Sequence, residues 1–225
     1  MSTETLSGLE RLLEGLPSPE AEQAAEILAG SASVEIEPGV PYFGRSFPDA
    51  AMLVVDDGFV VLRATFPRLA RSMITFEAAT GGVLLPPSPD EALFGLGRSR
   101  IRTISSERSA RLLSLPAAAR KVVERLISAL GQRQEAIANL ASARHLERVR
   151  RKLLQLAREH GHVVPDGIRI DFPVSHALLA EMIGSSRETV TRAIDELQRE
   201  GFVARDGSTY RLHASPESVL GIPDA

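Results

Sequence analysis

A short stretch near the C-terminus carries side chains suited to chemistry at the edge of a DNA base. Arg187, Glu188 and Arg192 lie close together, and winding the segment at about 100° per residue turns Glu188 and Arg192 away from its apolar face. A guanidinium can donate two parallel hydrogen bonds to guanine O6 and N7, and a carboxylate can accept one from the cytosine amino group. These three side chains therefore predict a reader of G·C base pairs. A solvated helix with ordinary surface charges is the alternative interpretation.

Two short helices joined by a tight turn are expected to position these side chains. Ser186 is a suitable cap for the second helix, because its hydroxyl can accept from the free amide hydrogens of the first turn. Gly184 suits the turn, and residues 178–183 supply the apolar side of the first helix. The apolar face of the second helix consists of Val190, Ala193, Ile194 and Leu197. This pattern is typical of a helix-turn-helix, whose second helix enters the major groove of DNA.

The segments on either side extend this unit into a winged helix. Residues 202–205 and 209–213 are strand candidates separated by Asp206-Gly207, a strong hairpin-turn signal. Ahead of the helices, residues 168–172 alternate like a strand, and residues 146–160 form an amphipathic helical pattern. We therefore expect residues 144–225 to form a winged-helix DNA-binding domain.

The segment LLAEMIGSSRETVTRAIDELQREGFV (178–203) resembles the DNA-binding region of the cyclic-AMP receptor and fumarate-nitrate regulator family, commonly called CRP/FNR. The resemblance is specific over about residues 146–213 and weakens toward the N-terminus. It implies a homodimeric transcription regulator that binds double-stranded DNA at a pseudo-palindromic, TGTGA-like site. Arg187 and Arg192 would then contact guanines, and Glu188 a cytosine.

Further DNA-binding residues follow from the same resemblance. Ser186 and Thr189, together with Ser175 and His176 at the start of the first helix, occupy positions that meet phosphates in the family. Thr191 shares the exposed face of the second helix and is included in the expected DNA-binding set.

Composition excludes several other classes of site. The 225 residues contain no cysteine, which rules out disulfides, Cys-zinc sites and Cys-ligated iron–sulfur clusters. All five histidines lie after residue 144, so the N-terminal part lacks the usual haem ligands and we expect no metal. The net charge of −3 does not by itself indicate nucleic acid. No apolar run approaches the ~18 residues of a membrane span, and the acidic N-terminus is unlike a signal peptide, so we expect a cytoplasmic protein.

The N-terminal part predicts an α+β arrangement that begins with two helices. Residues 6–16 form the first, and Ser18-Pro19 is expected to cap the second, which runs to about residue 29. Residues 51–55 and 59–65 flank Asp57-Gly58, a second predicted hairpin. Further strand candidates are residues 72–76, 82–85, 99–104 and 110–115. Many short strands favour a sandwich or barrel, and the family resemblance implies a β jelly roll over residues 1–115 as the effector or sensor domain.

The effector-binding motif of this roll is predicted to differ from that of the cyclic-nucleotide members of the family. Cyclic-nucleotide members of the family place a Gly-Glu pair about ten residues before an Arg-Ser or Arg-Thr pair. Arg98-Ser99 matches the second half, whereas Glu91 follows Asp90 in place of glycine. We therefore expect no cyclic-AMP binding of the usual kind and name Arg98 and Ser99 as the effector-binding candidates. A different anionic nucleotide effector, or none, stays open, and no cofactor is assigned.

A long helix over residues 116–142 is predicted between the two parts. Val123, Leu130 and Ile137 repeat every seven residues, which suits a two-stranded coiled-coil seam. Packing of this helix on its own roll is the compatible alternative. We assign residues 116–143 to dimerisation and to a hinge, with Arg144-His145 at the hinge.

Two other functions were weighed against a ligand-gated homodimeric regulator. An enzyme built on the roll would need clustered histidine and carboxylate ligands, and the roll contains no histidine, so we expect no enzymatic activity. An effector-independent regulator, or a scaffold whose roll recruits RNA polymerase or another protein, stays open.

Overall fold

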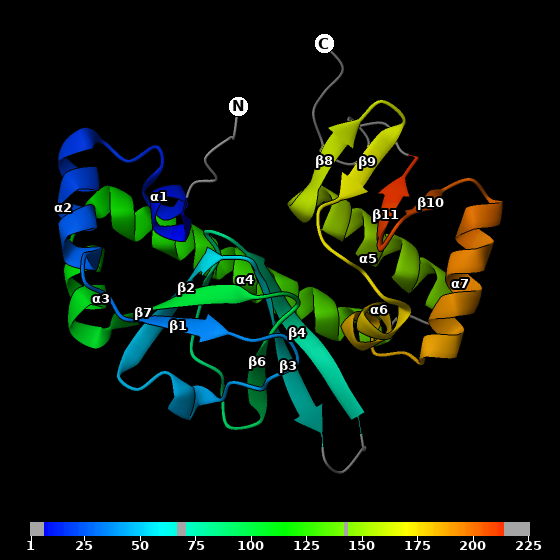
Figure 1. Cartoon of the computed structure of the whole chain (residues 1–225), viewed down its shortest axis with the longest axis horizontal. Coiled ribbons are helices and arrows are strands. Elements are labelled where there is room, and N and C mark those ends of the chain that lie inside the picture. The colour runs from blue at the N-terminus through cyan, green and yellow to red at the C-terminus, as the bar shows by residue number, and fades with distance from the viewer. Residues whose placement is uncertain (1–6, 67–70, 142–143, 214–225) are drawn as a thin grey trace. The chain divides into compact units, whose positions relative to one another are not determined.

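The computed structural model describes residues 7–66, 71–141 and 144–213 (Figure 1). The chain divides into two compact units, Met1–Glu135 and Ala136–Ala225. The first contains four helices and a β-sandwich, and the second contains three helices and a small sheet among the described residues. The predicted α+β class, with a jelly roll, a long helix and a C-terminal winged helix-turn-helix, is confirmed.

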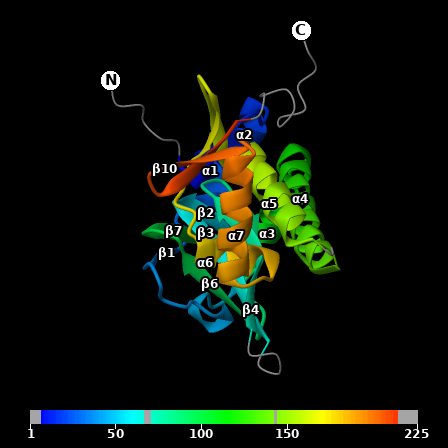
Figure 2. The same cartoon turned by 90° about the vertical axis from the view of Figure 1, so that its right-hand side faces the viewer.

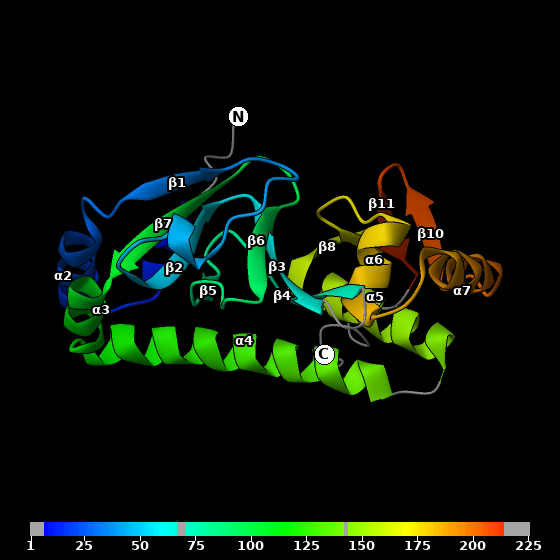
Figure 3. The same ribbon diagram turned by 90° about the horizontal axis from the view of Figure 1, so that it is seen from below.

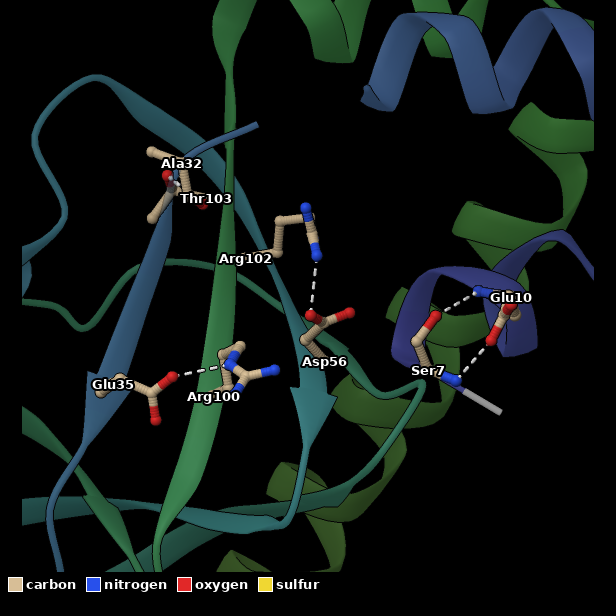
Figure 4. Close-up of polar contacts among 8 residues, drawn as sticks. All are labelled: Ser7, Glu10, Ala32, Glu35, Asp56, Arg100, Arg102 and Thr103. Atoms are coloured by element: carbon tan, nitrogen blue, oxygen red, sulfur yellow. Dashed lines mark hydrogen bonds and ion pairs between the residues drawn. The ribbon is translucent and has the colours of Figure 1, made fainter. Parts of the chain in front are cut away.

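The first unit begins with helices α1 (Gly8–Leu13) and α2 (Ser18–Leu28). Ser7 and Glu10 cap α1 reciprocally: the Ser7 amide donates to Glu10 Oε2 at 2.7 Å and the Glu10 amide donates to Ser7 Oγ at 3.3 Å (Figure 4). The cap predicted for α2 is wrong by one residue, because Pro17 is the N-cap and Ser18 already belongs to the helix. Proline near the start costs no hydrogen bond, since the first-turn amides of a helix have no partner within it.

Two antiparallel sheets form the roll. One has the order β1-β7-β2-β5, with β1 at Ser33–Ile36, β2 at Ala50–Asp57, β5 at Val83–Leu84 and β7 at Ser99–Ser105. The other has the order β4-β3-β6, with β3 at Phe59–Phe66, β4 at Arg71–Ala79 and β6 at Glu91–Gly95; a 3₁₀ turn spans Gly44–Ser46. Apolar side chains from both sheets form one core, which includes Ile36, Leu53, Val55, Val60, Leu62, Phe76, Leu93 and Ile101.

The hairpin predicted at Asp57-Gly58 is wrong. Strands β2 and β3 do follow one another, but β2 pairs with β7 and β5, whereas β3 pairs with β4 and β6. Both strands are buried along most of their length, so they serve as the two facing layers of the core and not as neighbours in one sheet. Gly58 makes the crossing between sheets at a φ of 91°, where an added Cβ would lie 2.5 Å from Ser99 Oγ.

The strand predicted at residues 110–115 is also wrong, because residues 110–113 belong to helix α3 (Ser106–Leu113) and residues 114–115 form the turn after it. Ser105 caps the helix by accepting a hydrogen bond from the Arg108 amide at 3.3 Å. Ser109 and Leu112, three residues apart on one helix face, are buried. Leu112 joins a second core cluster formed by the helices and one face of the β2 sheet, with Leu28, Met52, Val54 and Ile104 among its members.

Helix α4 (Pro116–Ala141) agrees closely with the prediction for residues 116–142 and is seen as one long helix in Figure 3. Ala118 and Val122 are buried in the second core cluster, and Leu126 packs against it. Val123, Ile127 and Leu130 face away from that cluster and are 47%, 62% and 60% exposed. The expectation that this helix packs on its own roll is therefore confirmed. The coiled-coil seam stays a prediction, and an apolar stripe on the other face is uncovered in the single chain.

The second unit has the winged-helix order. Its elements are α5 (His145–His160), β8 (Gly161–Val164), β9 (Gly167–Ile170), α6 (His176–Ile183), α7 (Arg187–Arg199), β10 (Val203–Asp206) and β11 (Thr209–Leu212). The four strands form one antiparallel sheet in the order β10-β11-β9-β8. Within the part of the chain that the structure describes, no helix is long and apolar enough to cross a membrane.

Candidate nucleic-acid interface

Helices α6 and α7 form the predicted helix-turn-helix and pack against each other (Figure 2). Gly184 ends α6 in the left-handed region at φ 62°, which glycine adopts without strain. The Ser185 amide then donates to the Ala180 carbonyl at 2.9 Å. Ser186 caps α7 by accepting from the Thr189 amide at 3.2 Å. The turn and both caps therefore fix where α7 begins.

The apolar face of α7 is buried as predicted. Val190, Ala193, Ile194 and Leu197 are all 5% exposed or less. On α6 the buried side chains are Leu178, Leu179, Ala180, Met182 and Ile183. Because this interface takes up one face of α7, the opposite face is left open to solvent.

Arg187, Glu188 and Arg192 are exposed on that open face. None of them forms an ion pair with another described residue. A hydrogen bond from its own backbone amide, the Ser186 hydroxyl and the charges of both arginines lower the pKa of Glu188. At neutral pH this site therefore presents two guanidinium donors and one ionised carboxylate acceptor, the groups needed to read a G·C pair.

The other predicted DNA-binding residues are placed around these three. Ser175 caps α6, its hydroxyl accepting from the Leu178 amide at 3.1 Å. Ser186 Oγ and Thr189 Oγ1 lie 3.0 Å apart at the exposed start of α7. His176 Nδ1 lies 2.8 Å from Thr191 Oγ1, which joins the first residue of α6 to the second turn of α7. His176 and Thr191 are thus half-buried in a contact between the helices, while the serines are exposed.

Arg205 is a further cation of this surface that the sequence analysis did not single out. It lies on β10, and its Nε donates to the Gly207 carbonyl at 3.2 Å across the Asp206-Gly207 turn. Its guanidinium carbon is 5.8 Å from the centre of the Tyr210 ring. The charge of Arg205 also contributes to lowering the pKa of His176, so the wing and the helix-turn-helix are electrostatically coupled. The position of Arg205 directly before the predicted Asp206-Gly207 turn could have indicated this residue from the sequence.

A buried arginine on α5 forms a hydrogen bond to the end of the first helix of the helix-turn-helix. Arg148 on α5 is 6% exposed, and its Nη1 donates to the Ile183 carbonyl at the end of α6 at 3.2 Å. Its Nη2 contacts His145 Nδ1, which also lies 3.1 Å from Ser185 Oγ in the turn before α7. The first residue of α5 is therefore linked by hydrogen bonds to the turn that orients the recognition helix.

The effector candidates Arg98 and Ser99 do not share one environment. Arg98 is exposed, whereas Ser99 is 1% exposed. The Phe59 amide donates to Ser99 Oγ at 3.2 Å, and the Phe59 and Gly97 carbonyls each lie 3.2 Å from the same oxygen. The Ser99 hydroxyl therefore stabilises the backbone at Phe59, where the chain passes from one sheet to the other.

The neighbouring arginines of β7 are largely neutralised. Arg100 pairs with Glu35 at 2.6 Å, and Arg102 pairs with the buried Asp56 at 2.8 Å (Figure 4). The alternating cations of this strand therefore contact the chain's own carboxylates.

Glu91, the other residue weighed for effector binding, is a buried anchor between β6 and α4. Its carboxylate accepts from Thr75 Oγ1 at 3.0 Å and Ser88 Oγ at 2.9 Å, and lies 3.4 Å from Arg133 Nη2 on α4. Burial on its own would raise the pKa of Glu91, but the Arg133 charge and the hydrogen bonds from Ser88 and Thr75 outweigh it and lower the pKa. Nothing in the sequence around Glu91 indicates that its partner is Arg133, 42 residues further along the chain.

Comparisons with known proteins point to one family. Residues 147–215 match the Crp-like helix-turn-helix domain. The Global nitrogen regulator of Synechococcus elongatus is 38% identical over 93 residues, 41% of this chain and 42% of that protein. The CRP-like cAMP-activated global transcriptional regulator of Mycobacterium tuberculosis is 28% identical over 121 residues, 52% of this chain and 54% of that protein.

The fold is similar over nearly the whole chain to a mutant of CooA from Carboxydothermus hydrogenoformans. The TM-score is 0.74 at 17% identity, covering 97% of this chain and 96% of CooA. In the sequence matches, by contrast, the chain spans about half the length of the curated relatives or less. Both curated relatives are named as regulators, which agrees with the expectation that the chain is not an enzyme.

Proposed function

We propose that the chain is a regulator of the CRP/FNR type, a homodimer that binds double-stranded DNA sequence-specifically. The observation that carries the proposal is the exposed face of α7. Arg187, Glu188 and Arg192 are held there by a capped and packed helix, and none has an ion-pair partner among the described residues. DNA base edges can supply hydrogen-bonding partners for the guanidinium and carboxylate groups of these side chains.

The proposed target is a pseudo-palindrome with TGTGA-like half-sites. Arg187 and Arg192 donate to guanine O6 and N7, and Glu188 accepts from a cytosine amino group. We assign contacts with the phosphates to the hydroxyl groups of Ser175, Ser186 and Thr189 and to the guanidinium of the wing residue Arg205. Because the ligand is DNA, we place the protein in the cytoplasm.

The proposed dimer forms along α4. Val123, Ile127 and Leu130 are exposed in the single chain, although large apolar side chains are usually buried. The spacing of Val123 and Leu130 matches a coiled-coil seam, and Ile137, the next residue in the predicted seam, has a side chain outside the described part. Two recognition helices held about 34 Å apart would enter successive major grooves on one side of the DNA.

The roll is proposed to be a diverged sensor that does not hold cyclic AMP through Arg98 and Ser99. Two observations support this: the Ser99 hydroxyl is buried and hydrogen-bonded to the backbone, and Arg98 is exposed. The relative from Mycobacterium tuberculosis is named as cAMP-activated, so cyclic AMP is the first nucleotide to test. The ion pair between buried Glu91 and half-buried Arg133 favours a second candidate, an effector-independent regulator, because the chain's own charges already connect α4 to the roll.

In vitro selection of random duplex DNA by the purified full chain tests the proposal. We expect enrichment of inverted repeats that contain TGTGA-like half-sites, and no enrichment by an Arg187→Ala/Arg192→Ala double variant. A wild-type pool without any shared sequence would contradict sequence-specific binding.

Repeating the selection with cyclic AMP, with cyclic di-GMP and without nucleotide separates the two candidates for the roll. Enrichment that depends on a nucleotide supports a sensor. Equal enrichment in all three arms supports the effector-independent regulator.

A further inference from the structure

The contact between His176 and Thr191 indicates which nitrogen of the neutral histidine ring carries the hydrogen. Thr191 Oγ1 donates its single hydrogen to the Arg187 carbonyl at 3.0 Å. The 2.8 Å contact with His176 Nδ1 must therefore have the ring as donor and the hydroxyl as acceptor. His176 thus carries its proton on Nδ1.

Protonation of the other ring nitrogen, His176 Nε2, is energetically unfavourable. His176 Nε2 is buried and has no hydrogen-bonding partner among the described residues. In the neutral ring this atom is an unprotonated acceptor, whereas in imidazolium it becomes a buried donor with nothing to receive its hydrogen bond.

The charges that face the ring act mainly in the same direction. Burial lowers the pKa of His176, and the positive charges of Arg205 on β10 and Arg187 on α7 lower it further. Asp195 on α7 opposes them but does not reverse the shift. The geometry and the charges therefore agree on a neutral ring.

We propose that His176 and Thr191 are positioning residues, and that the neutral ring fixes the rotation of α7 on α6. Protonation leaves the Nδ1 hydrogen in place but adds one at the buried Nε2, so the ring moves to solvate this new donor and its contact with Thr191 is broken. This inference rests on the proposed DNA-binding function. Thr191 lies beside Arg192 and binds the carbonyl of Arg187, so the contact lies between the two arginines proposed to read guanines. The apolar contacts between the helices fix their distance, but they are non-directional. A hydrogen bond depends on angle, so one between side chains of the two helices can also fix their relative rotation.

The first test needs no DNA. In nitrogen-15 NMR spectra of the full chain, His176 should show the Nδ1–H tautomer and titrate below the ordinary histidine pKa of about 6.5. An Nε2–H tautomer, or titration at or above that pH, overturns the proposal. His162, an exposed histidine that pairs with Asp171, provides the control variant for the next test.

The second test measures affinity for the selected duplex between pH 8 and pH 5.5 at fixed salt. Wild-type affinity should fall by about 5- to 150-fold as the pH decreases, because each of the two protomers of the proposed dimer loses one neutral hydrogen bond. His176→Phe keeps a ring but has no ionisable nitrogen, so its affinity should be reduced at pH 8 and show no such fall. His162→Gln is the matched control and should keep the wild-type profile.

Thr191 variants separate positioning from mere packing. Thr191→Val has nearly the same shape without the hydroxyl and should lose about 5- to 150-fold in affinity at pH 8, because both protomers of the proposed dimer lose the hydrogen bond. Thr191→Ser keeps the hydroxyl and should restore the wild-type affinity and pH profile. Thermal unfolding of each variant checks that it is folded.

The outcomes distinguish the failure of this inference from that of the proposed function. Wild-type binding that strengthens on acidification, but not in His176→Phe, means that the imidazolium contacts a phosphate directly, which overturns the positioning role. Equal pH profiles in wild type and His176→Phe also overturn it, while DNA binding stands. Absence of sequence-specific binding at pH 8 overturns the proposed function itself.

Discussion

Replacing Arg192 by alanine should weaken DNA binding without weakening the fold. The side chain is exposed on α7 and has no ion-pair partner among the described residues. Its removal therefore leaves no buried group unpaired, and we expect the free energy of unfolding to change by less than about 0.5 kcal/mol. Any loss of affinity then reports on contacts with DNA.

The size of that loss follows from the proposed contact. A bidentate hydrogen bond to guanine contributes about 1–3 kcal/mol of discrimination per base pair. A homodimer on a pseudo-palindrome loses two such contacts, or about 2–6 kcal/mol in total. The dissociation constant should therefore rise by a factor of about 30 to about 10⁴.

Fluorescence anisotropy with two duplexes measures this effect. One duplex carries the selected site, and in the other the G·C pair assigned to Arg192 is changed to A·T in both half-sites. Wild type should distinguish the duplexes, and Arg192→Ala should bind them nearly equally. Arg199→Ala removes the same charge two turns further along α7 and should keep the wild-type selectivity. An Arg192→Ala variant with full affinity and full selectivity would refute the reasoning.

Two further predictions concern the first unit. Sedimentation velocity should show that the double variant Ile127→Glu/Leu130→Glu is a monomer, because charged side chains replace the exposed apolar stripe. The control variant Ser128→Glu, on the same helix, should remain a dimer. A double variant that is still a dimer would place the interface elsewhere. The pKa of Glu91 is lowered in the folded state, so its stabilising contribution is present above the unfolded pKa of about 4.3 and is lost as the pH falls through the lower folded value. Urea midpoints should therefore decrease more between pH 6 and pH 3 for wild type than for Glu91→Gln, and parallel decreases would contradict this role.

Local sequence signals predicted the recognition helix well. The cap at Ser186, the glycine at the turn and the buried face of α7 depend on residues within a few positions of each other, and each lies where it was expected. The hairpin of the wing was likewise predicted from Asp206-Gly207. For such elements, periodicity and turn chemistry contain most of the information.

The errors in the roll arose where distant residues decide the structure. Asp57-Gly58 has the composition of a hairpin turn, but the partners of β2 and β3 are strands further along the chain. Residues 110–115 contain apolar residues suited to a strand, and their helical state depends on the cap at Ser105 and on the burial of Leu112 among other helices. Strand pairing and burial against remote elements leave no periodic signal in a single sequence.

The least predictable features were polar contacts between elements. His176 and Thr191 are 15 residues apart, and Glu91 and Arg133 are 42 apart. Ser99 resembled half of an effector-binding pair, yet its hydroxyl serves the crossing at Phe59, 40 residues away. In each case the residue type was visible in the sequence, whereas its partner was set by the fold.

Methylation interference on the selected duplex tests the central claim most directly, because a methyl group on guanine N7 blocks the atom that Arg187 and Arg192 are proposed to contact. We predict that N7 methylation of the guanines in both TGTGA-like half-sites abolishes binding, while methylation of adenine N3 in the minor groove of those half-sites does not. Binding that tolerates N7 methylation at every guanine would contradict major-groove reading by α7.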